Sequence, residues 1–221
     1  MADSFVFELS KVEELSIRRR MVAALRNVDD EFAATVARGL GLSEIPDPLP
    51  AARETLQLKP SPALSVIENG PQDFRGRKLG VLVADGVEDP DLDALTAAAQ
   101  AARANVEIVA PAVGGVTSAA GTVIAADQKL DGAPSVLYDA VAVLVSSEAV
   151  QSLADLPAAR DFVSDAFAHS KFIAYTPAVS DLFEAFGLAA KVDAGFFDLS
   201  RAGAEEFLSA CAKLRYWERF S

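Results

Sequence analysis

Cysteine and histidine are almost missing from this 221-residue sequence, which has one of each, Cys211 and His169. A single cysteine excludes a disulfide within the chain. A metal site built from several histidines is excluded too, and a Ser-His-Asp triad would depend on His169 alone. The sequence also has no apolar run of transmembrane length, and its first residues lack the basic and apolar regions of a signal peptide.

Positive charge is also in short supply. Lysine and arginine together number 20 against 32 aspartates and glutamates, which gives a formal net charge of −12. Such a chain repels phosphates, so nucleic acid and anionic membranes are not expected partners. Because 51% of the residues are hydrophobic, a substantial core is expected inside a soluble protein. The sequence does not indicate a cellular compartment.

The chain divides into three parts by composition. Residues 1–42 are predicted to be helical, with one helix around Ile17 to Leu25 and a second after Asp29 or Asp30. The Arg18–Arg20 run is interpreted as a solvent-exposed helix face. Residues 43–76 contain most of the prolines and are predicted to form an extended linker. Residues 77–221 are predicted to form the main domain.

The main domain begins with a stretch that predicts a strand, a tight turn and a helix. Leu79 to Ala84 is a short apolar run, typical of a parallel strand that is buried on both faces. Gly86 permits a sharp turn, and Asp89 followed by proline suits a helix start, with Asp89 as the N-cap. Glu88 then lies at the carboxyl end of the strand, where open α/β sheets place their sites.

Strands and helices alternate through the rest of this domain, which predicts an α/β fold with a mostly parallel sheet covered by helices on both faces. Further strands are expected at 106–110, 140–145 and 172–175, a hairpin at 116–126, and helices at 92–102, 158–168, 181–186 and 204–220. Cys211 shares a helical stripe with Phe207 and Leu214 and is interpreted as a buried, inert thiol. His169 is interpreted as the C-terminal residue of a helix.

Several stretches carry a resemblance to a known family. They are Arg77 to Gly86, Val106 to Pro111 with Gly114 to Val116, Ala126 to Lys129, Pro134 to Leu144 and Ala159 to Thr176. These stretches resemble the flavodoxin-like domain of the PfpI and class I glutamine amidotransferase-like superfamily, and more closely the C-terminal domain of large-subunit haem catalases. Phe5 to Val12 and Ile17 to Leu42 resemble the last helices of the catalytic part of such a catalase.

The resemblance implies a flavodoxin-like three-layer sandwich, preceded by two helices and a proline-rich linker. It implies that the parent is a haem catalase that disproportionates hydrogen peroxide, and that the partner of this domain is the catalytic part of a homotetramer. In the family, the haem ligands precede the matched segments. Tyr138, Tyr175 and Tyr216 do not lie in the proximal motif, so this chain alone is expected neither to bind haem nor to destroy peroxide.

The superfamily's active members place a cysteine on a strand-to-helix elbow beside a glutamate. By resemblance, Glu88 matches the glutamate, whereas Thr176 stands at the nucleophile position and Pro177 at that of the usual histidine. Threonine needs a base to act as a nucleophile, and proline supplies neither a base nor an N–H donor. We interpret the site as vestigial, with Glu88 accepting a hydrogen bond from Thr176. A weak hydrolase or deglycase that uses these two residues remains the alternative.

Other sites have weaker support. Ser146 and Ser147 follow a predicted strand but have no partner base, so turn or capping roles are expected. The acidic turn Asp85 to Asp91 would repel a nucleotide phosphate, and neither a cofactor nor a metal is expected in this chain. Three hypotheses result: a non-catalytic domain that stabilises a large catalase, a holdase-type chaperone for unfolding client proteins, and the weak hydrolase.

Overall fold

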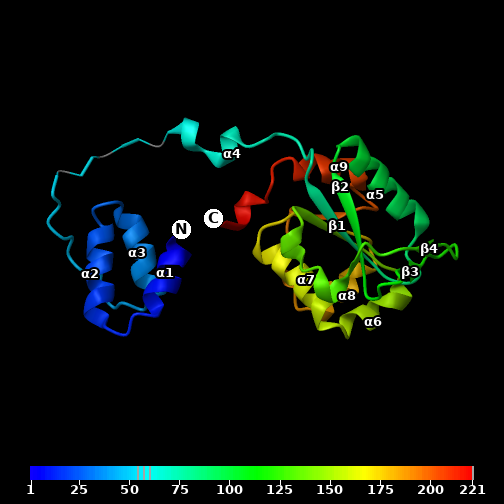
Figure 1. Ribbon diagram of the computed structural model, residues 1–221, viewed down its shortest axis with the longest axis horizontal. Coiled ribbons are helices and arrows are strands. Elements are labelled where there is room, and N and C mark those ends of the chain that lie inside the picture. The colour runs from blue at the N-terminus through cyan, green and yellow to red at the C-terminus, as the bar shows by residue number, and fades with distance from the viewer. Residues whose placement is uncertain (54, 57, 60, 221) are drawn as a thin grey trace. The chain divides into compact units, whose positions relative to one another are not determined.

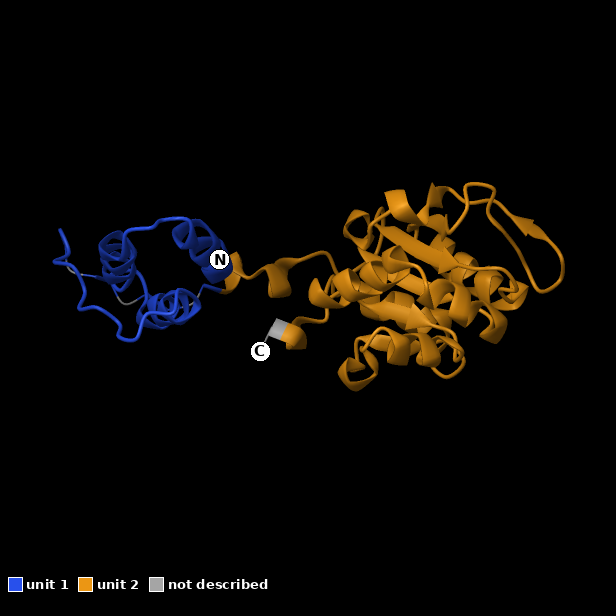
Figure 2. Ribbon diagram, turned by 90° about the horizontal axis from the view of Figure 1, so that it is seen from below, with its two compact units in different colours: residues 1–61 blue, residues 62–221 orange. Residues whose placement is uncertain are grey.

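The computed structural model describes residues 1–53, 55, 56, 58, 59 and 61–220. The described residues form two compact units, residues 1–61 and residues 62–221, which are coloured separately in Figure 2. Each unit has its own core, and each is described by itself. None of the helices in the described residues is both long and apolar enough to cross a lipid bilayer.

The first unit consists of the helices α1 (Ala2–Ser10), α2 (Leu15–Leu25) and α3 (Asp30–Gly39). Asp29 is the N-cap of α3, because its side chain accepts a hydrogen bond from the backbone N–H of Phe32. The helices enclose a small core of buried side chains: Leu9, Val22, Leu25, Ala33, Val36 and Ala37.

Two expectations for this unit need correction. The sequence predicted two helices, and helix α1 was missed. The Arg18–Arg20 run is also not uniformly solvated, because the guanidinium of Arg18 donates hydrogen bonds to the carbonyl oxygens of Ser10 and Val12. Arg18 thereby satisfies carbonyl groups at the end of α1 that have no partner within the helix. The break between α1 and α2 is stabilised by this contact.

The proline-rich segment is less extended than predicted. Helix α4 (Val66–Asn69) forms between Pro62 and Pro71, and its N-cap Ser65 accepts a hydrogen bond from the backbone N–H of Glu68. The gap between the two prolines is long enough for one helical turn, so proline density alone gave the wrong expectation here.

The second unit is built on a parallel sheet. In the described residues the strand order is β5-β2-β1-β6-β7-β8, and each neighbouring pair is parallel. A separate antiparallel hairpin pairs β3 with β4, as predicted. The strands are β1 (Lys78–Val83), β2 (Asn105–Ala110), β3 (Val116–Thr117), β4 (Val123–Ile124), β5 (Gln128–Lys129), β6 (Ala140–Leu144), β7 (Ile173–Tyr175) and β8 (Phe196–Asp198).

Helices cover both faces of the sheet, as Figure 1 shows. One face packs against α5 (Asp89–Ala101) and α9 (Gly203–Cys211). The other packs against α6 (Val150–Ala154), α7 (Pro157–Ala168) and α8 (Val179–Ala185). Successive residues of β1 alternate between these cores, with Val81 and Val83 on the α5 side and Leu82 on the other. The predicted flavodoxin-like sandwich is confirmed.

Two helix boundaries differ from the prediction. Asp89 is the first residue of α5 rather than its N-cap, which is Glu88. The last helix was expected to reach Phe220 but ends at Cys211. Leu214 then adopts a left-handed backbone conformation (φ 74°), and the N–H of Tyr216 binds the carbonyl oxygen of Ser170 instead of continuing a helix.

Candidate functional site

The carboxyl edge of the sheet is where an open α/β fold is expected to place a site. The strand order reverses at β1, because β2 lies on one side of it and β6 on the other. The turn after β1 carries Asp85 and Glu88, and the elbow after β7 carries Thr176. The sequence predicted that these two loops meet here and that Glu88 contacts Thr176.

The turn after β1 is bound to the β3–β4 hairpin. Gly86 adopts a left-handed conformation (φ 77°), and its N–H donates to the carbonyl oxygen of Thr117 at 2.8 Å. The carboxylate of Asp85 accepts a hydrogen bond from the N–H of Thr117, also at 2.8 Å. The N–H of Ala119 donates to Val87 at 2.9 Å. The hairpin therefore lies against the turn after β1, and the hydrogen bond to Asp85 stabilises this contact.

Two further hydrogen bonds tie this edge together. The carboxylate of Asp89 accepts from the N–H of Ala120 at 3.2 Å, and the hydroxyl of Ser146 donates to the carbonyl oxygen of Asp85 at 3.1 Å. Ser146 thus has a turn-stabilising role, as predicted, although its side chain caps no helix. Sequence reasoning missed the part played by Asp85 and Asp89, because their partners are backbone groups about thirty residues away.

Thr176 is buried, with 7% of its surface exposed. Its hydroxyl donates to the carbonyl oxygen of Val145 at 3.1 Å and accepts from the N–H of the same residue at 3.2 Å. Its own N–H binds the carbonyl oxygen of Val143 at 3.2 Å. The hydroxyl therefore continues the hydrogen bonding between β6 and β7 beyond the last paired residues. A hydroxyl acts as a nucleophile when a base accepts its proton. Here the hydroxyl donates its hydrogen bond to a backbone carbonyl oxygen, which is not a base of that kind.

Glu88 does not contact Thr176 as the sequence predicted. Its side chain is exposed at the start of α5, and among the described residues it makes no hydrogen bond to Thr176. The expected hydrogen bond from the hydroxyl to the carboxylate is replaced by the bond to Val145. Pro177, next in the elbow, has no N–H with which to bind an oxyanion.

A cavity of about 360 Å³ lies at this edge, between the ends of β1 and β2 and the loop after β6. Asp85 and Glu148 line it together with mainly small and apolar residues. Two carboxylates in its wall disfavour phosphate and other anionic groups. The acidic wall is therefore unfavourable for the phosphate groups of a nucleotide.

The side chains that usually bind metals or haem are dispersed. No cluster of metal-ligating residues occurs in the part of the chain that the structure describes. His169 is exposed at the C-terminus of α7, as predicted. Cys211 is buried, also as predicted, and burial raises the pKa of its thiol well above the ordinary value. Such a thiol is a poor ligand and a poor nucleophile.

Tyrosine can bind haem iron as tyrosinate, so the surroundings of Tyr138 and Tyr175 bear on this possibility. The ring of Tyr138 packs in the core over Gly80, and burial, with a contribution from the negative charge of Glu107, raises its pKa. Burial and the nearby Asp198 likewise raise the pKa of Tyr175. A raised pKa disfavours the tyrosinate form in which tyrosine binds iron.

Sequence reasoning missed a charged cluster at the amino ends of the strands, on the edge of the sheet opposite the elbow. Lys171 is 2% exposed, and its ammonium donates to the carbonyl oxygens of Ser135 and Tyr138. Burial lowers the pKa of Lys171 to about 8, and the positive charge of Arg215 acts in the same direction. A lysine directly before an apolar strand gives no signal of this burial.

Arg219 fixes the C-terminal segment to the same region. Its guanidinium binds both carboxylate oxygens of Asp193, at 2.7 and 2.8 Å, and donates to the carbonyl oxygen of Lys171 at 2.7 Å. It also lies 4.7 Å from the ring centroid of Phe167. Burial alone would raise the pKa of Asp193, but hydrogen bonds from Arg219 and Gly195 lower it. These contacts hold the C-terminal segment against the residues before β7 and β8.

Comparison with known protein families agrees with this geometry. A family described as the C-terminal domain found in long catalases matches residues 75–221. The chain belongs to this family. A second family, described as catalase-related and immune-responsive, matches residues 1–40. The long-catalase C-terminal domain therefore accounts for the whole parallel sheet and its helices.

Individual relatives extend the likeness to the full chain. Catalase C of Rhizobium meliloti is 52% identical over 99% of this chain. Catalase HPII of Mycobacterium avium is 36% identical over 98%, and catalase-2 of Bacillus subtilis is 30% identical over 98%. The chain spans about a third of the length of these relatives, 31%, 32% and 31% respectively.

Proposed function

We propose that this chain is the non-catalytic C-terminal part of a large-subunit catalase, whose remaining part binds haem and disproportionates hydrogen peroxide. Its role is to stabilise that catalytic part within a homotetramer. The supporting observation is the elbow after β7, where the hydroxyl of Thr176 donates its hydrogen bond to the carbonyl oxygen of Val145 and not to a base. The division into a helical tail (1–42), a linker (43–76) and a domain (77–221) belongs to the same proposal.

Truncation of the parent catalase tests this role. A full-length parent is compared with a version that ends before residue 75, at equal haem content. We expect similar turnover of peroxide at low temperature but faster inactivation on heating. Loss of turnover at unchanged haem content and unchanged heat resistance would show that the domain takes part in catalysis and would contradict the proposal.

A second role as a holdase for unfolding client proteins is favoured by one observation. Large apolar side chains are exposed between residues 56 and 67: Leu56 (75%), Leu58 (82%), Leu64 (84%), Val66 (64%) and Ile67 (59%). Exposed apolar side chains of this kind are able to bind unfolded segments, while the net charge of −12 favours solubility of the complex.

Light scattering from a heat-labile enzyme tests the holdase role. The chain is expected to suppress aggregation more than an unrelated protein of equal net charge. Serine at positions 56, 58 and 64 should abolish the effect. Serine at three exposed apolar positions elsewhere, Val28, Val113 and Val136, provides the matched control and should leave it intact. Equal loss in both triple variants would contradict a role for this segment.

The weak hydrolase remains the least supported alternative. It requires Glu88 to remove the proton of Thr176, and the described geometry assigns that proton to Val145. Turnover of ester or glycated substrates that disappears in Glu88→Gln would support it. We expect no such turnover, and a loss of stability of about 2 kcal/mol in Thr176→Val, because two hydrogen bonds to Val145 are removed.

A further inference from the structure

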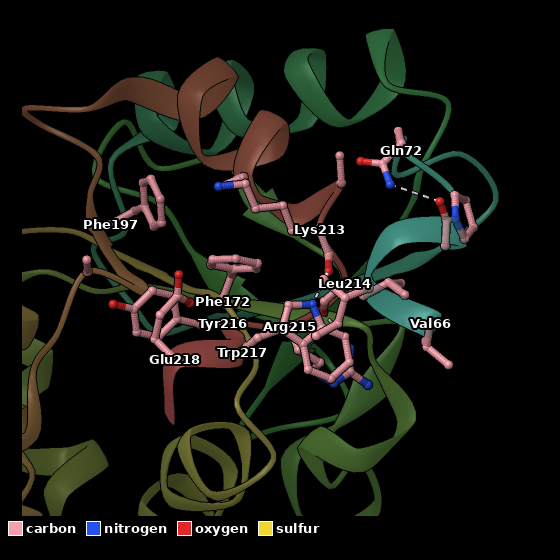
Figure 3. Close-up of a pocket in the computed structure, with 16 residues that line it drawn as sticks. Val66, Gln72, Phe172, Phe197, Lys213, Leu214, Arg215, Tyr216, Trp217 and Glu218 are labelled. Atoms are coloured by element: carbon pink, nitrogen blue, oxygen red, sulfur yellow. Dashed lines mark hydrogen bonds between the residues drawn. The ribbon is translucent and has the colours of Figure 1, made fainter. Parts of the chain in front are cut away.

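A second cavity lies within residues 62–221, on the amino side of the sheet and away from the elbow. Its volume is about 490 Å³, which is in the usual range for small-molecule sites. Figure 3 shows its main parts: helix α4, the residue before β7, and the segment that follows α9. The lining is mainly apolar, and its aromatic members are Phe172, Phe197, Tyr216 and Trp217.

The aromatic wall is held in place by contacts among its own rings. Phe172 lies 6.1 Å from Phe197 at an interplanar angle of 70°, and 6.1 Å from Tyr216 at 61°. Phe172 and Phe197 also belong to the core between the sheet and α9. Rings that are fixed by a core present a preformed surface, so little ordering is required when a flat ligand binds.

The charges at this cavity are opposite to those of the chain as a whole. Lys213 and Arg215 line it, with Glu218 as an acid. The guanidinium of Arg215 is used in part, since it donates to the carbonyl oxygens of Asp139 and Leu214. Lys213 is exposed, and its ammonium forms no ion pair with any described residue. The cavity thus offers a cation beside an aromatic wall in a protein of net charge −12.

We propose that this cavity binds a small anion with an aromatic body, such as an aryl-substituted carboxylate. The ring packs against the half-buried Phe197 and Tyr216, and the carboxylate lies toward Lys213. This inference does not depend on the role proposed above for the domain. An apolar protein segment is the alternative occupant, and it would not require an anionic group.

Trp217 is the only tryptophan in the sequence and lines the cavity, so its fluorescence reports directly on occupancy. We suggest titrating the full 221-residue chain with phenylbutyrate, phenylbutanol and phenylbutylamine, which share a ring and differ in charge. A saturable change is expected, with affinity in the order carboxylate, alcohol, amine. The proposal is overturned by an absence of saturable binding, or by equal affinity for carboxylate and alcohol, which points to a purely apolar groove.

Two variants locate the site. Lys213→Glu should weaken phenylbutyrate binding by about fivefold and change phenylbutanol binding little, because only the ion pair is lost. Lys129→Glu reverses an exposed charge outside the cavity and should have no effect. Ala194→Phe, at an exposed lining position, should weaken binding of all three compounds. Unchanged affinities in both Lys213→Glu and Ala194→Phe overturn the proposal.

Discussion

Removal of the Arg219 side chain should destabilise the second unit. In Arg219→Ala, the carboxylate of Asp193 loses both of its hydrogen bonds from the guanidinium, and the carbonyl oxygen of Lys171 loses a donor. The contact with the Phe167 ring is lost as well. The C-terminal segment would then be attached to the sheet by fewer contacts, among them the backbone bond from Tyr216 to Ser170.

The size of the effect follows from the burial of the pair. The side chain of Arg219 is 7% exposed and that of Asp193 is 28% exposed. Breaking a fully buried ion pair costs about 3–5 kcal/mol, and a hydrogen bond to a charged group contributes about 1.5–3 kcal/mol. Since water reaches Asp193 in part, we expect a loss of about 2–4 kcal/mol in the free energy of unfolding. Arg219→Lys keeps the charge but not the forked geometry and should lose about half as much.

Urea unfolding, followed by circular dichroism and by the fluorescence of Trp217, measures this loss. Arg160→Ala is the matched control, because Arg160 is exposed on α7 and its side chain makes no hydrogen bond or ion pair with a described residue. It should change the free energy by less than about 0.5 kcal/mol. If Arg219→Ala were as mild as Arg160→Ala, the argument from burial would be refuted.

Acid provides an independent check on the same pair. The folded-state pKa of Asp193 lies below its ordinary value of 3.8. Its contribution to stability is therefore fully present above pH 3.8 and is lost as the pH falls through the folded-state pKa. The difference in stability between the natural chain and Arg219→Ala should shrink in that acidic range, and a constant difference would contradict the assignment.

Two further predictions concern the core and its buried lysine. Gly80→Ala should lower the free energy of unfolding by about 1–3 kcal/mol, because a Cβ atom would lie 2.4 Å from the ring of Tyr138. Adding Tyr138→Leu to the same chain should recover part of that loss. Thermal unfolding of both variants measures these changes. For Lys171 the folded-state pKa is lowered from 10.5 to about 8, so the unfolded chain binds more protons between these values and stability should rise with pH there. Relative to Lys171→Met, the natural chain should gain roughly 1 kcal/mol per pH unit from pH 8 to pH 10 in urea unfolding, and a flat difference would show that the lysine is not desolvated.

Local sequence patterns predicted the hairpin and the parallel strands β1, β2, β6 and β7, but they missed the two short strands at the edges of the described sheet, β5 and β8. The apolar run from Leu79, the turn at Gly86 and the helix start at Pro90 depend on neighbouring residues only, and all appear in the structure within one or two positions. The helix end at Cys211 was not predicted, because the following segment leaves the helix to bind Ser170 far away in the sequence. Tertiary contacts overrode local propensity at that point.

The candidate site also combines features that the sequence could predict with contacts that it could not. The identities of Glu88, Thr176 and Pro177 were enough to predict a damaged nucleophile site, which remains a prediction. Their geometry was not accessible from sequence, because the partner of Thr176 is a backbone group of β6 that no pattern marks. The burial of Lys171 has the same explanation, since its partners are also backbone carbonyls.

The hydrogen bonds of the Thr176 hydroxyl have a consequence for attempts to place a catalytic nucleophile at this position. β6 and β7 pair as far as Val143 and Tyr175. The hydroxyl of Thr176 then makes the two hydrogen bonds to Val145 that a backbone peptide group would make if the strands were paired further. A cysteine introduced at this position would lie beside the backbone of Val145, and Pro177 would offer no N–H to an oxyanion. Placing an active nucleophile here therefore requires a redesign of the elbow as well as a change of the side chain.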